Sequence, residues 1–121
     1  MNVTYLTPLI VENIRDDMDK LMADFCVQVD SWLITVPTGF LTDESSVPRI
    51  PLAYWLMGGT GDRAGVVHDW LYSNDCPIRK GRAWADRVFK AALRAQGLPA
   101  WRAQIMYAGV RLGGASRYRV K

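Results

Sequence analysis

The sequence predicts an α+β fold in which an N-terminal antiparallel β-hairpin or small sheet is followed by three to four helices, two of them central and antiparallel. β-branched and aromatic residues concentrate between positions 24 and 36, as is typical of strands. After position 61, apolar residues recur at helical spacing. With 121 residues the chain can form one core, so we expect a single domain over residues 1–121.

The strands are expected mainly in the run FCVQV-DS-WLITV, with a tight turn at Asp30 and Ser31. A further short strand is expected at residues 9–11. Residues 12–22 place apolar side chains at helical spacing, which favours a helical turn or an elaborated loop there. Four prolines and glycines then predict a structured loop that leads into a short helix around residues 52–57.

Three longer helices are expected in the second half of the chain. The first begins with Asp62 as N-cap and runs to residue 73; the second spans residues 82–96 and stops at Gly97. The third follows Pro99 and ends at two glycines, before a basic tail over residues 115–121. The expected buried stripes are Trp84, Val88, Ala91 and Ala95 on the second helix, and Trp101, Ile105, Ala108 and Leu112 on the third.

The charge is divided unevenly along the chain. Residues 1–76 hold 4 Lys/Arg against 11 Asp/Glu, whereas residues 77–121 hold 11 against 1. A basic C-terminal half can attract anionic lipid, nucleic acid or the acidic part of another copy in a homo-oligomer. Alternatively, the cations form the solvated face of a helix. This second interpretation concerns Arg79, Lys80, Arg82, Arg87, Lys90 and Arg94.

Several protein classes do not fit the sequence. No apolar run approaches the roughly 20 residues of a membrane span, and the first residues do not resemble a signal peptide, so we expect a cytoplasmic location. Cys26 and Cys76 are far apart and are expected to be free buried thiols. A single histidine is too few for a zinc hydrolase of the several-histidine type, and nucleotide-binding glycine motifs are absent.

The residues best suited to chemistry are His68, Asp69 and Tyr72 on one expected helix, together with Asp86 on the next. An imidazole can act as a general base, because its ordinary pKa of about 6.5 lies near neutrality. A carboxylate bonded to its other nitrogen would orient the ring, and Asp86 is the candidate. Tyr72 is expected to donate its hydroxyl to Asp69 or Asp86. The structural alternative is a buried His–Asp pair that only links two helices.

A cation site is expected beside this histidine. Asp69 is suited to a hard cation such as calcium or to a substrate group, and the neighbouring sequence MGGTG can supply backbone oxygens from Gly58, Gly59 and Gly61. An ordinary turn is the alternative for these glycines. A second polar cluster, TDESSVPR, offers Asp43, Ser46 and Arg49 as substrate-binding candidates, although helix capping and an Asp43–Arg49 contact would also explain it.

Four segments of the chain resemble a family of small phage and prophage proteins known as DUF1353: VPTGFLTDESSVPR, VVHDWLY, RAWADRVFKAAL and MYAGVRLGG. The resemblance covers about residues 9–114 and implies a phage-associated origin without assigning a reaction. Glu44 and Ser45 depart from the small or apolar residues that are more usual there. The matching positions are Gly39, Phe40, Thr42, Asp43, Ser46, Val47, Pro48, Arg49, His68, Asp69, Tyr72, Ala85, Asp86 and Phe89.

A shorter resemblance concerns about 30 residues. HDWLY followed by WADRVF is similar to the HDxxY and ADxxF pair of viral phospholipase A2 domains, although MGGTG lies closer to the histidine than their calcium loop does. The resemblance implies that His68 activates water, Asp69 binds calcium and Asp86 orients the histidine. We therefore expect a phage-encoded ester hydrolase in the host cytoplasm. The alternative is a non-enzymatic protein of the virion or tail that contacts phage structural proteins or a host envelope component.

Overall fold

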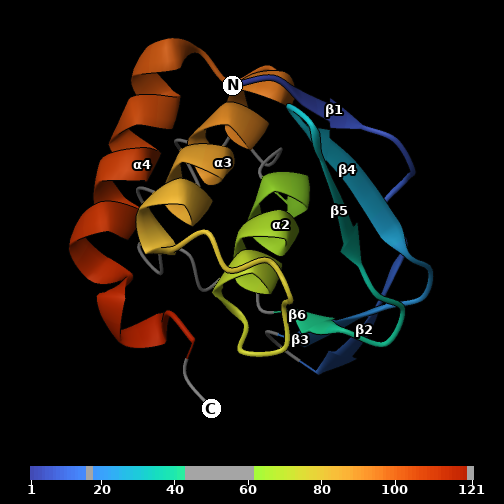
Figure 1. Ribbon diagram of the computed structural model, residues 1–121. Helices are drawn as coiled ribbons and strands as arrows, with labels where there is room; N and C mark the ends of the chain where they lie inside the picture. The colour runs from blue at the N-terminus through green and yellow to red at the C-terminus, as the bar shows by residue number, and fades with distance from the viewer. Residues whose placement is uncertain (16–17, 43–61, 120–121) are drawn as a thin grey trace.

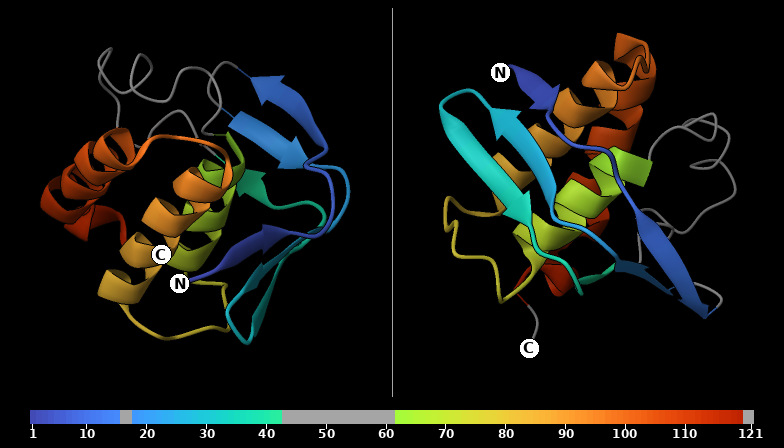
Figure 2. Two further views of the ribbon diagram at one scale, coloured as in Figure 1. Left: turned by 90° about the horizontal axis from the view of Figure 1, so that it is seen from above. Right: turned by 90° about the vertical axis from the view of Figure 1, so that its right-hand side faces the viewer.

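The computed structural model describes residues 1–15, 18–42 and 62–119. Within these residues two small antiparallel sheets precede three helices, which confirms the expected α+β class. The helices α2 (Asp62–Tyr72), α3 (Arg82–Ala95) and α4 (Ala100–Gly113) lie one beside the next (Figure 1). The views of Figure 2 place α2 between the strands and α3. Helix α2 is therefore the central element, and both of its neighbours can contribute to a site on it.

The first sheet contains the hairpin expected from the sequence. Strands β4 (Phe25–Val29) and β5 (Trp32–Val36) pair antiparallel, and β1 (Val3–Tyr5) adds to β4 on the other side. At the turn Asp30 has a φ of 51°, a left-handed conformation that aspartate tolerates better than most residues. The alternating burial along β4 shows that one face of this sheet packs on the core.

The second sheet corrects the expectation for residues 12–22. Instead of a helical turn or loop, this segment contributes to β2 (Val11–Arg15) and β3 (Met18–Leu21), which pair antiparallel, and β6 (Leu41–Thr42) adds to β3. The expected strand at residues 9–11 overlaps β2 only at Val11. The helical spacing of apolar residues was not a valid indication here. Every residue of β2 is exposed, so the apolar residues of this segment do not form one buried face of a helix.

The helix limits agree with the sequence to within one or two residues. Asp62 is the first residue of α2, and Gly97, with a φ of 100°, follows the C-cap of α3. Pro99 precedes α4 as its N-cap, and a 3-10 turn over Ala115–Arg117 follows it. The short helix expected around residues 52–57 lies outside the described residues.

The buried faces of α3 and α4 differ from the expected stripes. On α3, Trp84 and Val88 are buried, but Ala91 is only half-buried and Ala95 is exposed. On α4 the expected stripe is wrong throughout, because Trp101, Ile105, Ala108 and Leu112 are all exposed. The smaller stripe of Ala103, Met106 and Val110 is buried instead, packed near Phe89, Ala92 and Leu93 of α3.

The core has two adjoining parts. Side chains of β4 and β5 pack against α2, and residues of α3 and α4 form the second cluster. Cys76 is buried and Cys26 half-buried, both as free thiols. Within the described part of the chain, no helix combines the length and the apolar character needed to cross a bilayer.

Candidate His–Asp site

The expected pairing between α2 and α3 is present. Nε2 of His68 lies 2.8 Å from Oδ1 of Asp86, and both side chains are almost completely buried. His68 occupies a position on α2 that faces α3, while Asp86 lies on the buried face of α3 beside Ala85. The ring of His68 also packs against Phe89, with centroids 4.7 Å apart. The hydrogen bond between His68 and Asp86 is therefore shielded from water, which strengthens the electrostatic interaction between the two groups.

Tyr72 joins this pair from one helical turn further along α2. Its hydroxyl donates to the same Oδ1 of Asp86 at 2.5 Å, and its ring lies 4.1 Å from that of His68 between centroids. Of the two carboxylates considered for the hydroxyl, Asp86 is therefore the acceptor. Burial, together with the Asp86 carboxylate, raises the pKa of Tyr72 well above its ordinary value, so its hydroxyl remains protonated as a donor.

Two arginines complete the surroundings of the carboxylate. Nη1 of Arg111, on α4, donates to Oδ2 of Asp86 at 2.8 Å. Arg82, one turn before Asp86 on α3, donates from Nε to the hydroxyl of Tyr72 at 3.2 Å and from Nη2 to the carbonyl oxygen of Val110 at 2.9 Å. Arg82 is therefore part of this network, which corrects its assignment to a solvated basic face.

The network keeps Asp86 ionised. Burial raises the pKa of this carboxyl, but hydrogen bonds from His68, Tyr72 and Arg111 outweigh burial, and the net pKa lies below its ordinary value. An ionised carboxylate accepts hydrogen bonds and cannot donate them. Nε2 of His68 is consequently the nitrogen that donates to Asp86. In a neutral ring, this arrangement leaves the lone pair on Nδ1.

Nδ1 of His68 is buried and has no hydrogen-bond partner among the described residues. A buried polar atom without a partner costs about 1–3 kcal/mol, so it calls for an explanation. A water molecule or a substrate group that reaches Nδ1 would remove this cost. The fixed tautomer and the unpartnered nitrogen together allow His68 to accept a proton at Nδ1.

Asp69 is directed to a different neighbour. Its Oδ2 accepts a hydrogen bond of 2.6 Å from the hydroxyl of Thr42, which is buried on β6. The structure thus joins His68, Tyr72 and Asp86 to one another, while Asp69 links α2 to the second sheet. No cluster of three or more His, Cys, Asp or Glu side chains with metal-binding geometry occurs in residues 1–15, 18–42 and 62–119. Calcium takes six to eight oxygen ligands, so these residues alone do not form a calcium site.

Asp43, Ser46 and Arg49, expected to bind substrate, lie outside the described residues, as do Gly58, Gly59 and Gly61, expected to supply oxygens to a cation. Their roles stay predictions.

Sequence reasoning missed Arg82, Arg111 and Thr42 as partners of the site. A signal existed for Arg82, because it lies four residues before Asp86 and helical residues at this spacing face one another. Arg111 and Thr42 are brought in from α4 and β6, more than 20 residues away from their partners. No local spacing rule indicates such contacts.

The comparisons with known proteins support one assignment. A family model described as "Protein of unknown function (DUF1353)" matches residues 19–110, which include the whole network except Arg111. The chain belongs to the DUF1353 family. The match covers most of the chain and confirms the resemblance seen in the sequence. Searches of curated proteins and of solved structures found no match.

Proposed function

We propose that this DUF1353 protein is an ester hydrolase in which His68 activates water. The observation that carries the proposal is the state of the imidazole: Nε2 is held by Asp86 at 2.8 Å, and Nδ1 is buried without a partner among the described residues. Asp86 is a positioning residue, since it fixes the tautomer and stabilises the imidazolium that forms. Tyr72 and Arg111 position Asp86 in turn.

The proposed reaction uses the free Nδ1 lone pair of His68. Nδ1 of His68 accepts a proton from water while the water oxygen forms a bond to the ester carbonyl carbon. The tetrahedral intermediate then breaks its bond to the alcohol oxygen, and the imidazolium returns the proton to that oxygen. The products are a carboxylic acid and an alcohol, and the ring is neutral again.

The proposed substrate is an ester of a phospholipid, on the strength of the HDxxY and ADxxF resemblance. Asp43, Ser46 and Arg49 are proposed to contact it. Calcium is proposed as a cofactor, and Asp69 with backbone oxygens of Gly58, Gly59 and Gly61 would hold it and so place positive charge beside the reacting carbonyl. We further propose that the protein is phage-encoded and acts in the host cytoplasm.

The test is hydrolysis of short-chain esters and of phospholipids by the purified protein, with calcium added or chelated. His68→Ala should reduce the rate at least 100-fold while circular dichroism shows a folded protein, and added imidazole should restore part of the rate. Tyr118→Phe serves as the control and should keep full activity. Absence of hydrolysis by the wild-type protein under every condition contradicts the proposal, as does full activity of His68→Ala.

A second candidate function rests on the burial of the same side chains. His68 is only 1% exposed, and Asp86 accepts hydrogen bonds from three donors, as in a polar link that only joins helices. In this alternative the chain is a non-enzymatic virion or tail-associated protein, and it contacts phage structural proteins or a host envelope component. Mass spectrometry of purified phage particles tests it, because a structural protein must be present in stoichiometric amounts.

A further inference from the structure

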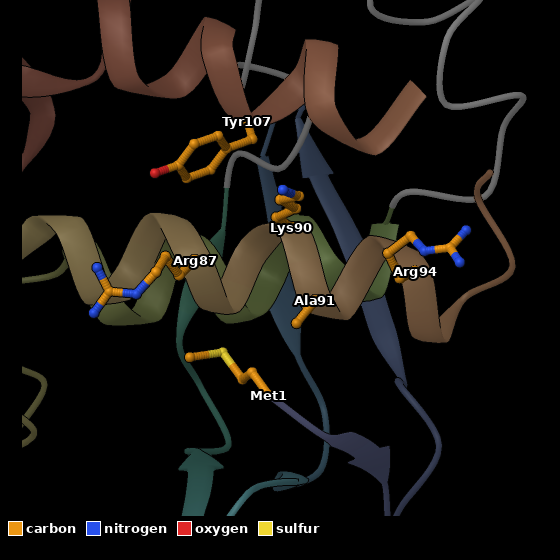
Figure 3. Close-up of a pocket in the computed structure, with 6 residues that line it drawn as sticks. All are labelled: Met1, Arg87, Lys90, Ala91, Arg94 and Tyr107. Atoms are coloured by element: carbon orange, nitrogen blue, oxygen red, sulfur yellow. The ribbon is translucent and has the colours of Figure 1, made fainter. Parts of the chain in front are cut away.

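A second candidate site lies over the outward face of α3. A cavity of about 480 Å³ is lined by Met1, Arg87, Lys90, Ala91, Arg94 and Tyr107. Figure 3 shows Arg87, Lys90 and Arg94 along α3, with Tyr107 of α4 on one flank and Met1 on the other. The volume lies within the range of small-molecule sites, roughly 300–1,000 Å³. Three of the six lining residues are cations, and none is acidic.

The arrangement of these cations is unfavourable for the helix by itself. Lys90 follows Arg87 by three residues and precedes Arg94 by four, so each neighbouring pair places like charges on adjacent turns, which destabilises a helix. No ion pair joins any of the three to a carboxylate among the described residues, whereas Arg82 and Arg111 both lie near Asp86. An anion bound between them would relieve this repulsion.

Two of the three cationic groups are already held by neutral oxygens. Nζ of Lys90 donates to Oε1 of Gln104 at 2.6 Å and lies 5.3 Å from the centre of the Tyr107 ring. Nη1 of Arg94 donates to the carbonyl oxygen of Leu98 at 2.8 Å. These partners restrict the side chains without neutralising their charge. The loss of side-chain freedom on binding an anion is thereby reduced.

We propose that this cavity binds the phosphate group of a phosphate-bearing ligand. In Figure 3 the guanidinium groups of Arg87 and Arg94 point toward opposite ends of this part of α3, with Lys90 between them. Arg87 can turn toward Lys90 and form paired hydrogen bonds to phosphate oxygens, Lys90 adds a point charge, and Arg94 adds positive charge at the far end. The Tyr107 ring and the Met1 side chain supply apolar surface for the part of the ligand that carries the phosphate. Both a soluble phosphate ester and a phospholipid headgroup present this chemistry.

This site is independent of the proposed hydrolysis. Asp86 faces His68 on α2 from the buried side of α3, whereas Arg87 and Arg94 are exposed on its outward side. Neither Lys90 nor Tyr107 contacts the network around Asp86 through a hydrogen bond. Loss of phosphate binding and loss of ester hydrolysis can therefore be observed separately.

The experiment measures binding to the full chain at low salt. Isothermal titration calorimetry with pyrophosphate and with glycerol 3-phosphate tests soluble ligands, and co-sedimentation with phosphatidylglycerol vesicles, against phosphatidylcholine vesicles, tests a lipid headgroup. The variant is Arg87→Gln combined with Arg94→Gln. The matched control is Lys20→Gln combined with Arg79→Gln, which removes the same charge from exposed positions outside the cavity. Thermal melting verifies that both variants fold.

Saturable binding of a soluble phosphate or of phosphatidylglycerol vesicles, weakened at least tenfold in the cavity variant and less than twofold in the control, supports the site and identifies the source of the phosphate. Equal weakening in both variants overturns it, because net charge alone would then explain the binding. Binding of neither soluble phosphates nor vesicles also overturns it. A DNA duplex titrated in the same way covers the remaining case: binding to the duplex but to neither soluble phosphates nor vesicles also overturns the proposal and indicates a nucleic-acid surface instead.

Discussion

Nη1 of Arg111 lies 2.8 Å from Oδ2 of Asp86, which ties the last turn of α4 to a carboxylate that faces α2. The other oxygen of Asp86 accepts hydrogen bonds from His68 and Tyr72. Donors from α2 and α4 therefore meet at one residue of α3. Asp86 has no exposed surface. The charge of this single carboxylate therefore contributes both to the packing of the three helices and to the orientation of the histidine.

The stability of the protein should depend on pH through Asp86. Its pKa is lowered in the folded state, so the unfolded chain, with a pKa of about 3.9, binds protons more readily. The stabilisation that the ionised Asp86 carboxylate provides is present at pH values above the unfolded pKa. It is lost as the pH falls through the lower pKa of the folded state. We expect the free energy of unfolding to decrease below about pH 4, as measured by urea denaturation at a series of pH values.

Asp86→Asn is the variant that isolates this contribution. At neutral pH it should cost about 1–3 kcal/mol, because Arg111 loses its charged acceptor and an amide replaces the buried carboxylate beside His68 and Tyr72. Between pH 4 and the acid limit its stability should change less than that of the wild type. Asp24→Asn provides the comparison: the backbone and hydroxyl of Thr38 lower the pKa of Asp24 too, but this residue is exposed. An unchanged acid profile in Asp86→Asn would contradict the assignment.

The sequence predicted the hairpin and the His68–Asp86 pairing because both depend on local rules. Alternation around Asp30 defines two strands and their turn, and the four-residue spacing of His68 and Tyr72 places them on one face of α2. The next helix was expected to run antiparallel to α2 with the Asp86 carboxylate at the edge of its apolar face, and His68 is then the natural partner of that carboxylate. These elements required no knowledge of distant contacts.

The rotation of α4 could not be predicted in this way. Its sequence contains two apolar stripes at helical spacing on opposite sides, one with Trp101 and Leu112 and one with Met106 and Val110. Periodicity alone favoured the larger side chains. The observed rotation agrees with the contacts between α4 and α3. Asp86 accepts a hydrogen bond from Arg111, and Arg82 donates one to the carbonyl oxygen of Val110. Such contacts join residues more than 20 positions apart.

The hydroxyl of Tyr72 should contribute measurably to this network. Tyr72→Phe removes a buried donor to Asp86 and the acceptor of Nε of Arg82, which we expect to cost about 1–3 kcal/mol in urea denaturation. The pKa of Asp86 should rise, because one of the hydrogen bonds that lower it is lost. Nuclear magnetic resonance titration of the Asp86 carboxyl carbon measures that change.

Tyr118→Phe is the matched control. Tyr118 packs edge-on against the Tyr72 ring, with centroids 5.2 Å apart, and its hydroxyl forms no hydrogen bond within the described residues. Its removal should change stability by less than about 0.5 kcal/mol. If both phenylalanine variants have the same stability, the short contact between Tyr72 and Asp86 does not contribute to folding.

Gly114 should be required for the position of the Tyr72 hydroxyl. A Cβ at Gly114 would lie 2.6 Å from Oη of Tyr72 and 2.6 Å from the carbonyl oxygen of Val110, both too close for real contacts. Its φ of −88° suits any residue, so the obstacle is space alone. Gly114→Ala should therefore displace Tyr72 or the end of α4 and cost about 1–3 kcal/mol.

Gly113 is the control for the lack of space at Gly114. A Cβ at Gly113 meets nothing within 4 Å, so Gly113→Ala should leave stability unchanged or raise it by up to about 1 kcal/mol, as alanine favours the helix. The double variant Gly114→Ala with Tyr72→Phe should be less destabilised than the sum of its single changes, because the missing hydroxyl frees part of the space. Strict additivity would assign the whole effect to the carbonyl oxygen of Val110 and remove Tyr72 from the explanation.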